Sequence, residues 1–303
     1  MGPTASGKTA CAVEWAQCLN TEIISVDSAL VYKGLNIGSA KPDSETLKLA
    51  PHRMIDIREP HEIFSAADFA LEALPHMYAL AWQGKIPLLV GGTGLYFQAL
   101  MQGLSEMPAA DAQVRAILKA QVEVEGWQYM HERLKIIDPV SAQRIHPNDP
   151  QRILRALEVY EISGKSLTDW QSQSQQKPFP FRVLELVLAP SDRSVLHERI
   201  ALRFDQMLEQ GFLDEMHGLM ANPLLHRDLP SMRAVGYRQA WSHLMGEINF
   251  DAFRNLAITA TRQLAKRQLT WFRGQSYSHW LDPQNQKDTL NYELRKFINR
   301  LEN

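Results

Sequence analysis

The most specific chemical pattern in the chain is residues 2–9, which read G-P-T-A-S-G-K-T. They fit the phosphate-loop pattern G-x-x-x-x-G-K-[S/T] at every fixed position. The two glycines let the backbone approach an oligophosphate closely, and consecutive N–H groups at the start of the following helix then bind the anion. Lys8 supplies a mobile positive charge, and the Thr9 hydroxyl is placed to bind Mg²⁺. The sequence therefore predicts a phosphate site with Mg²⁺ on Thr9, formed by Gly2, Pro3, Thr4, Ala5, Ser6, Gly7, Lys8 and Thr9.

A phosphate loop normally follows a buried strand, but only Met1 precedes this one. The core strand that normally carries the loop is therefore missing from this sequence. We expect a truncated N-terminus, and the alternative is a loop that is anchored in another way.

Two further polar residues follow predicted strands. Asp27 comes directly after residues 21–26 (T-E-I-I-S-V), and Thr93 follows residues 86–90 (I-P-L-L-V) after two glycines. Ligands bind at the carboxyl edge of an open parallel sheet, so we expect both side chains at the ligand site. Asp27 is then a water-mediated Mg²⁺ ligand, a general base or only a turn cap. Thr93 can bond a diphosphate oxygen or a base, and the lack of an acid after its strand argues against an ordinary nucleotide hydrolase.

A third candidate for this site is Arg203, in the helical segment H-E-R-I-A-L-R-F that follows a strand predicted at residues 183–188. Arg199 and Arg203 share a helix face because they are four residues apart. One of them can act as an electrostatic clamp on phosphate, and the alternative is an ordinary surface arginine.

The charge distribution indicates a polyanionic partner, although the net charge is only −2. Residues 252–281 contain no Asp or Glu, but they contain five arginines and lysines. Three segments also combine arginine with aromatic or polar residues, the mixture that binds unstacked bases. These segments are residues 151–155 (Q-R-I-L-R), 233–238 (R-A-V-G-Y-R) and 266–273 (K-R-Q-L-T-W-F-R).

The elements that position these residues alternate between helix and strand. We expect a helix at residues 9–19, strands at 21–26 and 86–90, and a helix that begins at Ser65. This order predicts a phosphate-loop NTPase-like α/β fold with a parallel sheet and helices on both faces. Residues 109–177 show amphipathic helical patterns without a clear strand, best at 111–125 and 150–163. We therefore expect a core of residues 1–108 and 178–303, with an all-helical insertion at 109–177.

The composition, with 45% hydrophobic and 22% charged residues among 303, is typical of a globular protein with a full core. There is no run of 18 apolar residues and no secretory leader. We expect a cytoplasmic, monomeric protein without a membrane span.

Six motifs follow one another along almost the whole chain. They are G-P-T-A-S-G-K-T at 2–9, V-D-S-A-L-V-Y-K-G-L-N-I-G-S-A-K-P at 26–42, G-G-T-G-L-Y at 91–96, Q-R-I-L-R-A-L-E-V-Y at 151–160, R-A-V-G-Y-R at 233–238 and K-R-Q-L-T-W-F-R at 266–273. Together they resemble the motifs of bacterial-type tRNA dimethylallyltransferases. The resemblance implies transfer of a dimethylallyl group from its diphosphate to the exocyclic amine of the adenine 3′ of the tRNA anticodon.

The resemblance also implies roles for individual residues. Lys8 and Thr9 would hold the leaving diphosphate with Mg²⁺, Arg203 would add positive charge, Asp27 would take the proton of the amine, and Thr93 would support it. The implied contacts to the anticodon stem-loop are Asp27, Ser28, Ala29, Leu30, Thr93, Arg115, Gln151, Arg152, Ile153, Leu154, Arg155, Arg233, Ala234, Val235, Gly236, Tyr237, Arg238, Lys266, Arg267, Gln268, Leu269, Thr270, Trp271, Phe272 and Arg273.

Three alternative functions remain open from the sequence. An adenylate-type isopentenyltransferase would use a free nucleotide as acceptor, but the helical insertion and the basic segment favour a large polyanion. A small-metabolite kinase of the phosphate-loop class should carry a lid arginine cluster and a metal-holding acid, and neither is clear. A non-catalytic tRNA-binding protein would not need Lys8, Thr9 and Asp27 together.

Overall fold

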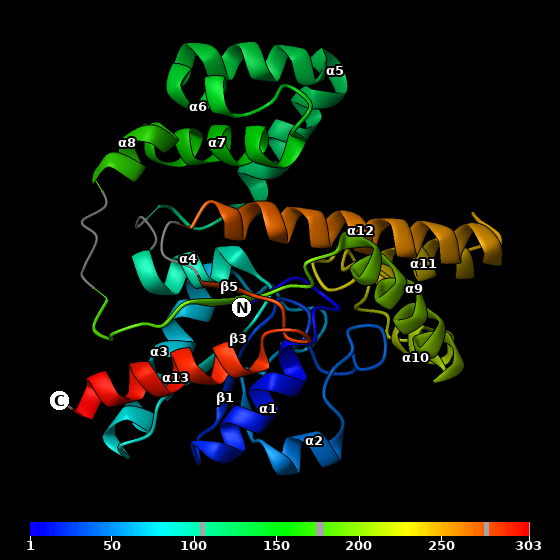
Figure 1. Cartoon of the computed structure of the whole chain (residues 1–303). Helices are drawn as coiled ribbons and strands as arrows, with labels where there is room; N and C mark the ends of the chain where they lie inside the picture. Colours follow the sequence, from blue (N-terminus) through cyan, green and yellow to red (C-terminus); the bar gives the residue numbers. More distant parts are fainter. Residues whose placement is uncertain (104–106, 174–178, 276–278, 303) are drawn as a thin grey trace. The chain divides into compact units, whose positions relative to one another are not determined.

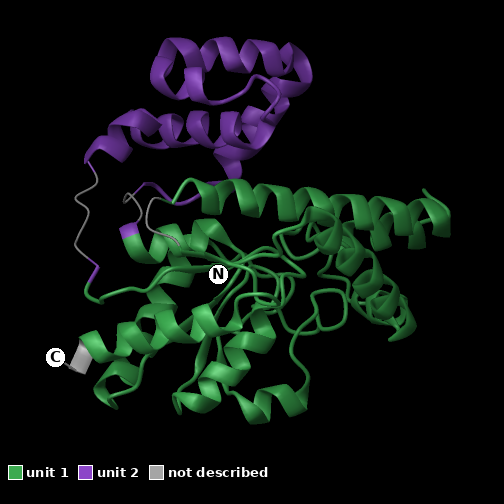
Figure 2. Ribbon diagram, viewed as in Figure 1, with its two compact units in different colours: residues 1–101, 180–303 green, residues 102–179 purple. Residues whose placement is uncertain are grey.

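The computed structural model describes residues 1–103, 107–173, 179–275 and 279–302. The chain divides into two compact units (Figure 2). The core unit comprises Met1–Met101 and Pro180–Asn303, and the helical unit comprises Gln102–Phe179.

The core unit contains two parallel sheets (Figure 1). In the first, β1 (Ile23–Val26) lies between β2 (His52–Arg53) and β3 (Leu88–Gly91). In the second, β4 (Leu186–Leu188) pairs with β5 (His279–Leu281). Val26 lies opposite Gly91 in the register of β1 and β3. The residues that follow these two strands therefore leave the sheet at the same edge.

Both faces of β1 are covered. Ile23 packs with Ala12 and Ala16 of helix α1 (Lys8–Cys18). Ile24 and Val26 point to the opposite face, because successive strand residues alternate, and both are fully buried. Together with the parallel pairing, this confirms the predicted mixed α/β class.

Backbone hydrogen bonds hold Met1 and Gly2 between the two sheets. The Met1 amino group donates to Leu186 O at 2.7 Å, and Leu188 N–H donates to Met1 O at 2.9 Å. On the other side, Gly2 N–H donates to Gly91 O at 3.2 Å. A Cβ on Gly2 would lie 2.3 Å from Leu188 O, so only glycine fits here. The phosphate loop is thus anchored to β3 and to β4.

The other helices of the first part of the core unit are α2 (Ser44–Leu49), α3 (Ala66–Trp82) and α4 (Gly94–Gln102). Ser65 and Asp68 form a capping box at the start of α3, as the sequence predicts. The sequence also predicts that Pro75 kinks or splits this helix, but α3 runs on as one helix through Pro75.

The second part of the core unit contains α9 (Arg193–Glu209), α10 (Phe212–Met220), α11 (Tyr237–Leu244), α12 (Phe250–Arg273) and α13 (Lys287–Glu302). Aromatic side chains join four of them: Phe204 meets Phe212 and Phe253 edge to face, and Phe212 meets Tyr237 in the same way. Arg254 adds a two-pronged ion pair to Asp205, with both N–O distances 2.6 Å. These contacts fix α9, which carries Arg203, against α12.

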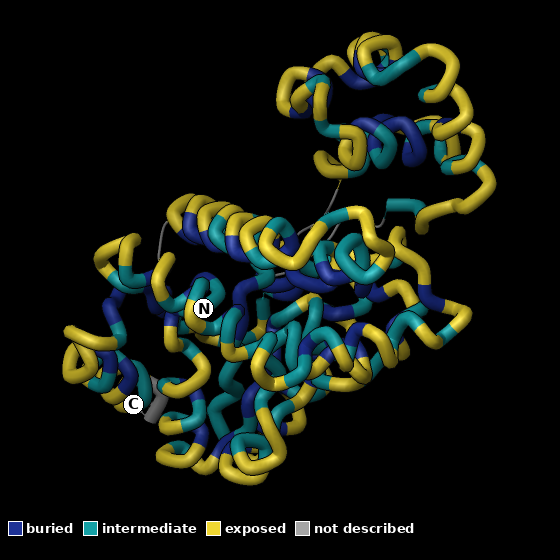
Figure 3. Tube along the Cα trace, turned by 90° about the vertical axis from the view of Figure 1, so that its right-hand side faces the viewer, coloured by how far each residue is buried: buried dark blue, intermediate teal, exposed yellow. Residues whose placement is uncertain are grey.

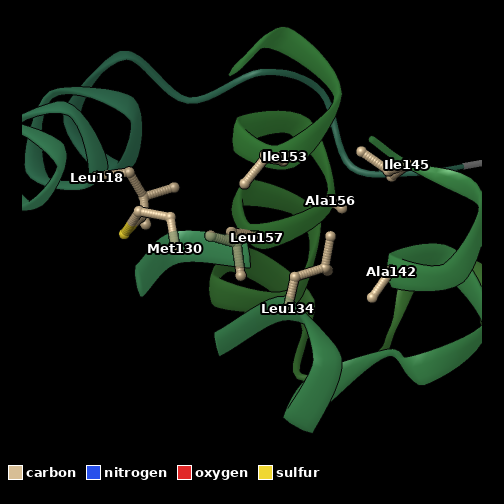
Figure 4. Close-up of a cluster of buried hydrophobic side chains, with 8 residues drawn as sticks. All are labelled: Leu118, Met130, Leu134, Ala142, Ile145, Ile153, Ala156 and Leu157. Carbon is tan, nitrogen blue, oxygen red and sulfur yellow. The ribbon is translucent and has the colours of Figure 1, made fainter. Parts of the chain in front are cut away.

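The described residues of the helical unit form α5 (Ala112–Ile137), α6 (Pro139–Arg144), α7 (Pro150–Ser163) and α8 (Leu167–Gln173), with no strand among them. Gly126 has non-helical backbone angles within α5, so its first segment ends where the sequence predicts. Apolar side chains from α5, α6 and α7, together with Ile145 directly after α6, form the core of this unit (Figure 4). The buried residues are Leu118, Met130, Leu134, Ala142, Ile145, Ile153, Ala156 and Leu157.

Burial follows this arrangement (Figure 3), with buried segments inside the core unit and exposed outer helix faces. None of the described helices combines the length and the apolar character needed to span a bilayer.

Candidate active site

The phosphate loop leads into an uncapped helix N-terminus. Gly7, the N-cap of α1, is left-handed with φ +89°, and no described side chain caps the helix. Ser6 Oγ is buried and has no hydrogen-bond partner among the described residues. Free N–H groups at a helix start attract anions, and a buried hydroxyl without a partner can donate to a ligand. The loop therefore has the donors that an oligophosphate requires.

Three charged side chains from different elements interact beside this loop. Lys8 is at the start of α1, Asp27 follows β1, and Arg203 is on α9. Burial lowers the pKa of Lys8 to about 8, Asp27 opposes this shift, and Arg203 adds to it. Burial also lowers the pKa of Arg203, again opposed by Asp27. Two partly buried cations and one carboxylate thus share one small region, with Lys8 Nζ donating to Pro3 O at 3.2 Å.

Asp27 and Thr93 meet at the carboxyl edge of the first sheet. Thr93 N–H donates to Val26 O at 3.2 Å, and Ser28 N–H donates to Thr93 Oγ1 at 3.1 Å. Ala29 N–H donates to Asp27 Oδ1 at 2.9 Å, which fixes the carboxylate in a local turn. No described residue donates to Asp27 Oδ2. One carboxylate oxygen is therefore available for a substrate.

The glycines around Thr93 make room for neighbouring chain segments. A Cβ on Gly91 would lie 2.0 Å from Val26 O, and one on Gly92 would lie 2.3 Å from Gln268 Nε2. A Cβ on Gly94 would lie 2.3 Å from the Trp271 ring. The turn after β3 is thus packed directly against α12.

Three solved structures have the same fold over almost all of this chain. The tRNA isopentenylpyrophosphate transferase of Bacillus halodurans is 38% identical, with 98% of this chain and 93% of that chain covered and a TM-score of 0.70. The tRNA delta(2)-isopentenylpyrophosphate transferase of Staphylococcus epidermidis is 35% identical, with coverages of 98% and 97% and a TM-score of 0.65. A eukaryotic dimethylallyltransferase acting on tRNA is 26% identical, with coverages of 99% and 78% and a TM-score of 0.80.

A model of the family described as IPP transferase matches residues 30–275, which is well over half of the chain. The chain belongs to the IPP transferase family. This membership confirms the resemblance that the six sequence motifs indicate.

In this IPP transferase family member, the core-unit segments predicted to contact tRNA have an exposed and a buried side. Ser28, Arg233, Arg238, Lys266, Arg267, Thr270 and Arg273 are exposed. Asp27, Ala29, Leu30, Thr93, Ala234, Val235, Gln268 and Trp271 are partly buried. Gly236, Tyr237, Leu269 and Phe272 are buried. The sequence treats each segment as one contact surface, whereas in the structure each segment contains residues of different exposure.

The helical unit divides its predicted contacts in the same way. Gln151 and Arg152 are exposed at the start of α7, Leu154 is partly buried, and Ile153 is fully buried in the apolar core. Arg115 and Arg155 both donate to the buried Glu158 carboxylate, at 2.8 and 2.9 Å. Their charge is therefore partly used inside the unit, and Arg152 offers the most exposed cation of this set.

Glu215 of α10 is a supporting residue that sequence reasoning missed. It accepts hydrogen bonds from the backbone N–H groups of Asn36, Ile37 and Gly38, and from Tyr237 Oη at 2.6 Å. Burial and the nearby Glu215 raise the pKa of Tyr237. Glu215 thus ties the segment after Asp27 to the R-A-V-G-Y-R segment. Nothing local in an ordinary amphipathic helix predicts such a long-range contact.

Proposed function

We propose that this protein transfers a dimethylallyl group from dimethylallyl diphosphate to the exocyclic amine of the adenine 3′ of the anticodon in tRNA. The observation that carries the proposal is that Lys8, Asp27 and Arg203 interact with one another beside the phosphate loop. The chain that contains this site is 38% identical, over 98% of its length, to a tRNA isopentenylpyrophosphate transferase.

The donor diphosphate is assigned to the phosphate loop. Breaking the allylic C–O bond leaves the electron pair, and therefore additional negative charge, on the diphosphate. Lys8, Arg203, Ser6 Oγ and the start of α1 supply positive charge and hydrogen-bond donors for this charge. Donors that are already in place before the bond breaks lower the barrier most effectively.

The acceptor adenine is assigned to the edge formed by Asp27 and Thr93. Its amine nitrogen forms the new bond to the allylic carbon, and its proton passes to the available oxygen of Asp27. Thr93 supports this step by accepting from Ser28 N–H and so fixing the turn that carries Asp27. The adenine must leave the stacked anticodon loop to reach this edge, as in other enzymes that act on a base.

Mg²⁺ would bind at Thr9 and at the donor diphosphate. Among the described residues, no group of three His, Cys, Asp or Glu side chains is placed to hold a metal. Mg²⁺ keeps several waters and often uses only one or two protein ligands besides substrate phosphates, so a single hydroxyl at the helix start fits this ion. The ion would supply additional positive charge for the leaving diphosphate.

The tRNA is assigned to the exposed cations of the predicted segments, chiefly Arg233, Arg238, Lys266, Arg267 and Arg273 of the core unit. Such side chains bind phosphates of the anticodon stem-loop. Gln151 and Arg152 of the helical unit would add contacts. We also propose a monomeric protein that acts in the cytoplasm.

A transfer assay tests the function. The protein is incubated with dimethylallyl diphosphate labelled in the allyl group, Mg²⁺ and either unmodified tRNA or AMP. Label in tRNA but not in AMP supports the proposal. Label in AMP would assign the protein to free-nucleotide acceptors. In a parallel reaction with ATP and small metabolites, phosphate transfer from ATP would favour a kinase.

A further inference from the structure

The motif K-R-Q-L-T-W-F-R at the end of α12 has two faces with different surroundings. Lys266, Arg267, Thr270 and Arg273 are exposed, whereas Leu269 and Phe272 are buried. Gln268 and Trp271 lie between these groups and are partly buried. Because residues three and four apart share a helix face, Gln268 lies on the same side as Ala265 and Phe272, which face the interior. Gln268 therefore has surroundings unlike those of its basic neighbours.

The side-chain amide of Gln268 connects two backbone segments of the active site. Thr4 N–H of the phosphate loop donates to Gln268 Oε1 at 2.9 Å. Gln268 Nε2 in turn donates to Gly92 O at 3.0 Å. One side chain thus uses both its acceptor and its donor, each on backbone more than 170 residues away in sequence.

The two segments that Gln268 joins belong to opposite halves of the reaction site. Thr4 is in the loop assigned to the donor diphosphate. Gly92 directly precedes Thr93, which accepts from Ser28 N–H beside Asp27 at the acceptor edge. Gly92 has no space for a Cβ because the Gln268 amide would lie 2.3 Å away. The close packing restricts movement of the phosphate loop relative to the Thr93 turn.

We propose that Gln268 is a positioning residue, not an RNA contact: it holds the phosphate loop against the Thr93 turn and links both to the basic helix α12. This inference rests on the proposed function. The exposed side of the same motif binds tRNA phosphates, so docking of tRNA on α12 and alignment of the donor loop share one rigid element. Loss of the bridge leaves the basic surface intact and loosens the donor site.

The test compares Gln268→Met, which keeps the side-chain volume but removes both hydrogen bonds, with Gln268→Ala. Gln263→Ala is the matched control, because Gln263 is an exposed glutamine on the same helix. Thermal unfolding first establishes that each variant folds. Calorimetry then measures binding of inorganic pyrophosphate with Mg²⁺, and steady-state kinetics give KM for dimethylallyl diphosphate at saturating tRNA. A filter-binding assay gives the Kd for tRNA.

Both Gln268 variants are expected to weaken pyrophosphate binding and to raise the donor KM roughly tenfold, since each loses two hydrogen bonds that order the loop. The Kd of both variants for tRNA should stay within about twofold of the control, because the exposed cations that bind the tRNA phosphates are unchanged in both. A weaker tRNA complex with unchanged donor binding would make Gln268 an RNA contact and overturn the inference. So would folded variants in which neither quantity changes.

The pyrophosphate measurement separates this inference from the proposed function, because it needs no prenyl transfer. Weaker pyrophosphate binding by the variants supports the bridge even if the wild-type protein does not modify tRNA. If the wild-type protein transfers the prenyl group but the Gln268 variants bind pyrophosphate as tightly as the wild type, the bridge alone is overturned. Failure of the wild-type protein to bind pyrophosphate overturns the donor-site assignment and the bridge together.

Discussion

Replacement of Asp27 by Asn tests the acceptor half of the site most cleanly. Asp27 Oδ1 accepts from Ala29 N–H at 2.9 Å, and the side-chain oxygen of Asn can accept the same bond. The turn is therefore kept, whereas the group that takes the proton is lost. Removal of a general base lowers the rate by roughly 10²–10⁴-fold, or about 3–5 kcal/mol of activation free energy. Binding of tRNA should change by no more than a few fold.

Comparison with Asp27→Ala separates the base from the turn. Alanine loses the proton acceptor and also the bond to Ala29, which is worth roughly 0.5–1.5 kcal/mol. We therefore expect Asp27→Ala to be about two- to tenfold less active than Asp27→Asn. Single-turnover transfer to unmodified tRNA, with tRNA binding measured separately, gives both numbers. An Asn variant that retains more than about a tenth of the wild-type rate would refute the role of Asp27 as the base.

Three other changes probe the donor loop, the RNA surface and the helical unit. Burial lowers the pKa of Lys8 to about 8, while Asp27 raises this pKa and Arg203 lowers it further. In the free protein, Lys8 therefore loses its proton as the pH rises through 8. Binding of pyrophosphate, measured by calorimetry, should therefore weaken above pH 8. In Lys8→Arg the part of this decrease that comes from Lys8 should be absent, because arginine stays protonated. The same pH dependence of binding in both proteins would contradict the role of Lys8. Arg267→Ala should weaken binding of all substrate tRNAs and flatten the salt dependence of Kd, while a loss restricted to one base sequence would argue against a phosphate contact. Ile153→Ala should lower the free energy of unfolding by about 2–5 kcal/mol in denaturant titrations, because Ile153 is fully buried in the core of the helical unit. If it instead weakens tRNA binding without loss of stability, its side chain contacts RNA.

The sequence predicts the parts of the site that depend on local patterns. The phosphate loop is contiguous, and Asp27 and Thr93 each directly follow a predicted strand or its glycine turn. Parallel pairing of β1 and β3, with Val26 opposite Gly91, brings these two together without further information. The helix at residues 150–163 is also predicted correctly, because Pro150 and Gly164 mark its ends in the sequence.

The sequence cannot predict the parts that depend on long-range packing. The strand predicted at residues 183–188 is paired only at Leu186–Leu188, since pairing depends on its neighbour β5. The bridge from Gln268 to Thr4 and Gly92 joins three distant segments, so no local pattern separates Gln268 from the basic residues around it. The sequence likewise shows Glu158 only as an acidic residue in a predicted helix. In the structure it is buried and forms ion pairs with Arg115 and Arg155.

The most direct test of the proposed function is the identity and position of the modified nucleoside after reaction with full-length unmodified tRNA. The product is digested with a base-specific ribonuclease, and the fragments are analysed by liquid chromatography and mass spectrometry. The account predicts isopentenyladenosine at the adenine 3′ of the anticodon and at no other adenine, and it predicts that Asp27→Asn forms roughly 10²–10⁴-fold less of it in the same initial reaction time. Modification spread over several adenines, or an equal yield with the Asn variant, would contradict it.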